Sequence, residues 1–124
     1  MAEGWGPNGA GTALDALVAA YPHVKLHIGA PGAAGTSNPA TETIRKTAAW
    51  NATGTDGIVE NSAAFSWTAI AGSQDATHAT GWSSVTHGAG NFGWSGTVTA
   101  NAYVAGDTYE VAIGGLVVSV PLAS

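Results

Sequence analysis

The stretch at residues 108–120, TYEVAIGGLVVSV, has the clearest structural pattern in this chain of 124 residues. Apolar residues occupy every second position from 109 to 113 and again from 116 to 120. Such alternation is typical of strands that bury one face. Gly114 and Gly115 separate the two halves, and a two-residue glycine turn favours a hairpin because glycine tolerates positive φ. The stretch predicts two paired antiparallel strands.

The rest of the chain repeats this arrangement of short strands and glycine-rich turns. Polar and apolar residues alternate from His23 to Ile28. Further strands are expected at residues 43–50, 57–60, 62–68, 83–87 and 91–101. Many short strands separated by glycine turns indicate a sandwich or a barrel. We therefore predict an all-β fold, an antiparallel β-sandwich of jelly-roll or immunoglobulin-like type at residues 23–120.

One short helix is expected before the sandwich, after an extended arm at residues 1–10. Apolar residues recur at helical spacing from Leu14, Thr12 can cap the first turn, and Pro22 ends the helix. The helix is predicted at residues 12–21, within a single domain. The expected core comprises Leu14, Leu17, Val18, Val24, Leu26, Ile28, Trp50, Phe65, Trp67, Val85, Val98, Val111, Ile113, Leu116 and Val118.

Charged residues are scarce, and this limits the possible partners. They make up 9% of the chain, against about 25% in an ordinary domain. The only cations are Lys25, Arg45 and Lys46, and the formal net charge is −5. Binding to nucleic acid or to an anionic membrane needs several cations, so neither partner is expected. A surface with so few charges favours packing against other subunits.

No targeting or membrane segment is expected. The first eight residues lack a basic region followed by an apolar one. The longest apolar stretches are far shorter than the roughly 18 residues that a membrane span needs. Production in a cytoplasm is expected.

Three patterns that resemble catalytic or cofactor motifs lack the structural context that their chemistry requires. His23 and His27 have a metal-ligand spacing, but on a strand they lie about 13 Å apart. Residues 88–93, GAGNFG, match a dinucleotide-binding motif, but strand-like sequence follows where a helix is needed. Ser95 is not in a complete nucleophile elbow. We therefore expect no enzyme activity, no cofactor and no bound metal.

Five tryptophans are available for contacts or for the core. Trp50 and Trp67 lie in strand patterns and are expected in the core, whereas Trp5 and Trp82 lie beside loops. The candidate interface residues for other subunits are Trp5, Pro7, Pro31, Pro39 and Trp82. An alternative function is carbohydrate binding, because exposed aromatic rings stack on sugars. Its candidate glycan contacts are Trp82, Asn91 and Trp94.

Five short motifs occur in an order that resembles a known group of proteins. They are LHIGAPG at residues 26–32, RKTAAW at 45–50, NSAAF at 61–65, TH at 86–87 and AGDTYEVAIGGL at 105–116. This order resembles small proteins of tailed bacteriophages, especially phages of actinobacteria, that are described as minor tail or tail-fibre-like proteins. The likeness covers roughly residues 21–120.

The resemblance implies a structural component of the virion, made in the bacterial host cytoplasm, without catalytic residues. A tail fibre or tail tip is the first assignment, and a capsid decoration or head-fibre protein is the alternative. The implied partners are other virion proteins and copies of the same chain, with a host surface glycan as a further candidate. One departure is the glycine-rich run at residues 88–93, where the related proteins often have apolar or aromatic residues.

Overall fold

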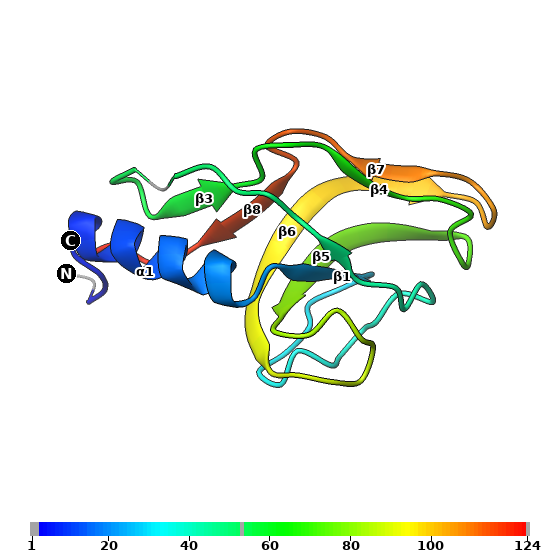
Figure 1. Cartoon of the computed structure of the whole chain (residues 1–124), viewed down its shortest axis with the longest axis horizontal. Coiled ribbons are helices and arrows are strands. Elements are labelled where there is room, and N and C mark those ends of the chain that lie inside the picture. Colours follow the sequence, from blue (N-terminus) through cyan, green and yellow to red (C-terminus); the bar gives the residue numbers. More distant parts are fainter. Residues whose placement is uncertain (1–2, 53, 124) are drawn as a thin grey trace.

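The computed structural model describes residues 3–52 and 54–123, which form one helix and eight strands in two antiparallel sheets (Figure 1). The elements are α1 (Pro7–Ala20), β1 (His23–His27), β2 (Lys46–Thr47), β3 (Ile58–Glu60), β4 (Phe65–Trp67), β5 (Gln74–Trp82), β6 (Phe92–Tyr103), β7 (Tyr109–Val111) and β8 (Leu116–Ser119). The larger sheet has the order β2-β1-β5-β6-β8-β3, and β4 pairs with β7 in the smaller one. The predicted all-β, sandwich-like fold with one short helix is confirmed.

The core lies where the larger sheet curls between α1 and the smaller sheet. Strand β6 is long and strongly bent, and β4 and β7 lie beside its far end (Figure 1). There the rings of Tyr103 and Tyr109 have centroids 5.3 Å apart. Leu14 and Val18 of α1 join the same apolar cluster as Trp67 of β4. One continuous core therefore connects the helix with both sheets.

Helix α1 begins at Pro7, so residues 7–10 of the predicted arm belong to the helix, and the predicted Thr12 cap was wrong. Proline suits the first helical position because its φ is already helical and its missing N–H is not needed there. The Thr12 hydroxyl instead donates to the Asn8 carbonyl, 3.2 Å away, within the helix. The predicted end holds, because Tyr21 terminates the helix just before Pro22.

The predicted hairpin at residues 108–120 does not form, because β7 and β8 belong to different sheets. The turn itself exists: Gly114 has a φ of 75°, and the Gly115 N–H donates to the Ala112 carbonyl at 2.9 Å. However, the buried side chain of Asn61 donates to the Ala112 carbonyl and accepts from the Leu116 N–H. Asn61 thereby takes backbone groups that flank the turn, and the chain crosses from one sheet to the other.

Strand β5 was not predicted, whereas the strand expected at residues 83–87 is a loop. The inward positions of β5 carry small residues such as Ala76, Ala79 and Gly81 instead of large apolar ones. A Cβ at Gly81 would overlap the indole of Trp94 on the neighbouring strand β6. Large side chains from β6 fill the space over β5, so the strand lacks the alternation that identifies strands in a sequence.

Most of the expected core is confirmed, and the exceptions share a cause. The buried members are Leu14, Val18, Val24, Leu26, Trp67, Val98, Val111, Leu116 and Val118, and Leu17, Trp50 and Phe65 pack against them. Ile28, Val85 and Ile113 are exposed. Ile28 follows the end of β1, and Val85 and Ile113 lie in segments that are turns rather than strands.

Candidate functional site

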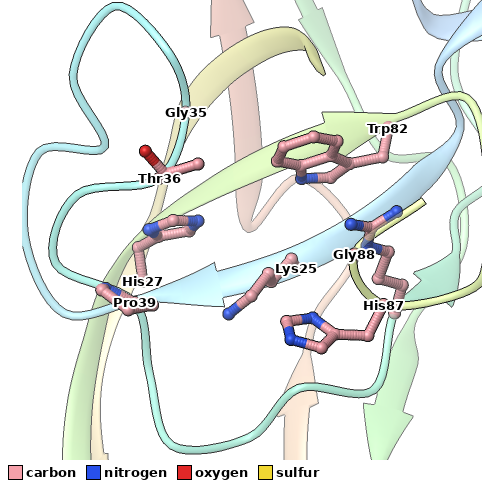
Figure 2. A pocket seen from close by; sticks show the side chains of 9 residues that line it. Lys25, His27, Gly35, Thr36, Pro39, Trp82, His87 and Gly88 are labelled. Carbon is pink, nitrogen blue, oxygen red and sulfur yellow. The ribbon is translucent and has the colours of Figure 1, made fainter. Parts of the chain in front are cut away.

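A cavity of about 340 Å³ opens on the face of β1 opposite the apolar core (Figure 2). Its walls come from β1, the loop at residues 28–39, Arg45 just before β2, the end of β5 and the loop at residues 83–91. The lining residues are Lys25, His27, Gly35, Thr36, Pro39, Arg45, Trp82, His87 and Gly88. Two glycine-containing loops therefore meet over one strand.

His27 forms the floor of the cavity and is 1% exposed. Its Nδ1–H donates to the Ser37 carbonyl, 2.9 Å away, because a carbonyl can only accept. Its Nε2 accepts from the Thr80 hydroxyl at 2.9 Å, and that hydroxyl accepts from the Trp82 indole N–H at 2.7 Å. Burial lowers the pKa of His27, so the neutral ring required by this chain of hydrogen bonds is favoured. The network fixes the Trp82 ring and the first loop.

Arg45 holds the second loop and the other side of Trp82. Its Nη1 donates to the carbonyls of Ser84 and Ala89, each 2.8 Å away. Its guanidinium carbon lies 4.4 Å from the centroid of the Trp82 ring, a cation–π contact. Phe92 supports the same ring at a centroid distance of 5.6 Å. Arg45 is therefore a structural part of the cavity wall as well as a source of positive charge.

Lys25 is the unusual residue of the cavity. It is 5% exposed, and its Nζ has no hydrogen-bond partner among the described residues. Burial lowers the pKa of Lys25, the positive charge of Arg45 lowers it further, and the carboxylate of Glu42 raises it. Glu42 itself accepts from the backbone N–H groups of Ile44 and Ala71. Figure 2 shows the Lys25 side chain lying between those of His27 and His87 in the cavity wall, where its Nζ is buried.

The structure separates the candidate interface residues into two groups. Trp82 and Pro39 line the cavity, whereas Trp5 and Pro7 are exposed at the end of the molecule where the two chain ends lie together (Figure 1). The Trp5 N–H donates to the Pro121 carbonyl at 2.9 Å, which ties the two ends to each other. Pro31 is buried beneath its loop, so its choice as a contact residue was wrong.

The proposed glycan surface of Trp82, Asn91 and Trp94 does not exist as a group. Trp94 is 4% exposed, its indole N–H donates to the Tyr21 carbonyl, and its ring packs edge-on against Trp50. Alternation along β6 turns Trp94 toward the core. Asn91 is exposed in the second loop but does not line the cavity. Only Trp82 of the three is placed to meet a ligand there.

Sequence reasoning missed the charged residues of this site. Lys25 and His27 were expected on a polar, solvent-facing side of the strand, but the two loops cover that side. One signal was available, a lysine four residues before the glycine-rich stretch that begins at Gly29, but nothing in the sequence places Arg45 beside the loop at residues 83–91. Within residues 3–52 and 54–123, no cluster of three or more His, Cys, Asp or Glu side chains is suited to hold a metal ion. The same part of the chain contains no helix long and apolar enough to span a membrane.

The fold and the site define a small sandwich-like β-domain with a cavity between two loops. Residues 11–119 match the family described as Podophage GP4 fiber I protein gp80. The chain belongs to this family of phage fibre proteins and is therefore a component of the virion. No curated protein and no solved structure matches it. The predicted phage fibre resemblance is confirmed at this level, whereas the minor tail assignment and the actinobacterial host group stay predictions.

Proposed function

We propose that this protein is a non-enzymatic subunit of a phage tail fibre, which assembles with copies of itself and with other virion proteins. The family match over residues 11–119 is the observation that carries the proposal. A fibre subunit acts through its contacts, and it needs no reaction centre for that role.

The surface of the domain supports an assembly role. Charged residues make up only 9% of the chain, while several large apolar side chains are exposed. These are Trp5, Ile28, Ile44, Ile58, Val85, Val104 and Ile113. Contacts made by such side chains depend on apolar burial and hydrogen bonds, so they should respond weakly to salt.

The position in the particle is tested by electron microscopy of purified virions labelled with an antibody against this protein. Label on the tail supports the proposal. Label on the capsid would replace it with the alternative, a head-fibre or decoration protein. Absence of the protein from purified particles would overturn both.

Self-assembly is tested by measuring the molar mass of the purified chain by light scattering after size exclusion. We expect an oligomer whose mass is the same at low and high sodium chloride concentrations. A monomer at every concentration would contradict assembly through copies of itself.

A further inference from the structure

The cavity gathers positive charge in a chain that is otherwise acidic. Two of the three cations, Lys25 and Arg45, line it, and His87 lies at its edge (Figure 2). The third cation, Lys46, is not part of the lining. Because the net charge is −5, this concentration of cations distinguishes the cavity from the rest of the molecule.

Folding alone gives no reason for a lysine at position 25. A buried ammonium without a hydrogen-bond partner is costly, and buried polar groups in proteins are almost always paired. Lys25 is 95% buried and unpaired, although an apolar side chain of similar length would fill the same space. The carboxylate of Glu42 is not a hydrogen-bond partner of Lys25: it accepts from the backbone N–H groups of Ile44 and Ala71, and no described residue bonds to Lys25 Nζ. No side chain of residues 3–52 and 54–123 therefore completes the hydrogen bonding of Lys25.

The walls of the cavity are rigid before any ligand arrives. His27 and Thr80 fix one edge of Trp82, and Arg45 holds its face and the second loop. Walls that are ordered in advance reduce the entropy lost on binding. The cavity is at the lower end of the range of about 300–1,000 Å³ typical of ligand sites. It has room for one ring-sized group beside the indole of Trp82 and the ring of Pro39.

We propose that this cavity binds an acidic ligand of the size of one sugar residue, with its carboxylate or phosphate at Lys25 Nζ and its ring against Trp82 and Pro39. Charge-assisted hydrogen bonds from a buried ammonium are the strong kind. Arg45 adds positive potential without giving up its bonds to the second loop. This inference goes beyond the fibre assignment and rests on the cavity alone, so it holds for a tail or a capsid location.

The ligand class is tested by titrating the full chain separately with glucose, glucuronate and glucose 6-phosphate. Binding is measured from the changes in the amide chemical shifts in NMR spectra. The three probes share a ring and differ at one substituent, and inorganic phosphate serves as the anion without a ring. We expect at least one acidic sugar to shift the amides of Gly35, Thr36 and Gly88, with an affinity at least tenfold above that of glucose and of phosphate. Equal binding of glucose, or no shift at these residues with either acidic sugar, would overturn the proposal.

Two single-charge variants decide whether Lys25 is the contact. Lys25→Met should weaken binding of the acidic sugar at least tenfold, whereas Lys46→Met removes the same charge outside the cavity and should leave binding unchanged. An equal loss in both variants would indicate a general charge effect and would contradict the proposal. Thr36→Trp provides a second test, because Thr36 is exposed at the cavity and a large ring there should block entry without a change in the core.

The remaining alternative is that the cavity binds an acidic side chain of a neighbouring protein and not an acidic sugar. If N-acetylglutamate amide bound at the same residues more tightly than either acidic sugar, the site would accept an acidic side chain of a neighbouring protein. The sugar assignment would then be wrong.

Discussion

The two faces of strand β1 are both buried, yet they are buried for different reasons. On one face, Val24 and Leu26 are fully covered by the apolar core. On the other, Lys25 and His27 are covered by two loops and border a cavity. The core face is completed by the fold, because every buried group there has apolar neighbours. On the cavity face, both ring nitrogens of His27 are hydrogen-bonded, whereas Lys25 Nζ has no hydrogen-bond partner among the described residues.

This difference indicates which buried residues stabilise the fold and which await a ligand. When a buried side chain that stabilises the fold is truncated, the free energy of unfolding of the protein falls. Removal of a buried charge without a partner should not lower the free energy of unfolding, because it also removes the cost of desolvating that charge. The two faces of one strand therefore offer a comparison within the same structural context.

The largest effect is expected on the core face. Leu26→Ala removes a fully buried side chain and should lower the free energy of unfolding by about 2–5 kcal/mol, measured by urea denaturation. Ile28→Ala, two residues further, is the matched control. Ile28 is 41% exposed beyond the end of β1, so its loss should cost less than about 1 kcal/mol. Similar losses in the two variants would mean that Leu26 is not as deeply buried in the core as described.

A somewhat smaller effect is expected where the core of the larger sheet depends on glycine. Gly81→Ala places a methyl group where the Trp94 indole lies, so we expect destabilisation of about 1–3 kcal/mol and a changed near-ultraviolet circular dichroism signal. Gly9→Ala is the control, because Gly9 lies in α1 with open space around it. That variant should gain up to about 1 kcal/mol. A neutral Gly81→Ala would contradict the packing of β5 against β6.

A smaller and pH-dependent effect is expected from His27. Above its ordinary pKa of 6.5, the ring is neutral in both the folded and the unfolded chain. Below that value the unfolded chain takes up a proton that the folded chain refuses, because burial lowers the pKa of His27 in the fold. Stability should therefore fall as the pH drops below 6.5. His27→Gln, which does not titrate, should lose less stability over the same acidification in thermal melts; an equal loss would show that another group is responsible.

The sequence was most informative where polar and apolar residues alternate along a strand. The fold class, β1 and most of the core were predictable from such patterns, and Pro22 predicted the end of α1. Strand β5 was not, because its inward positions are small and the rings that cover them come from β6. The hairpin failed for a similar reason, since the side chain of Asn61, far away in sequence, takes the backbone groups at its turn.

The candidate site was less predictable than the fold. Pro39 was identified only as a contact residue for other subunits, and Trp82 was identified both as such a contact and as a candidate glycan contact. The environment of Lys25 depends on loops at residues 28–39 and 83–91 closing over β1, and periodicity within the strand carries no information about that. Trp94 was named as a candidate glycan contact, and its burial was missed. That burial depends on Gly81 in the neighbouring strand β5, which leaves space for the indole.

The most direct measurement is the free energy of unfolding of Lys25→Met in the absence of any ligand, compared with the original chain under the same conditions. If the cavity face of β1 is kept for a ligand, the variant should be as stable as the original or more stable, by roughly 1 kcal/mol. A clear loss of stability would show that Lys25 serves the fold, and the distinction between the two faces would fail.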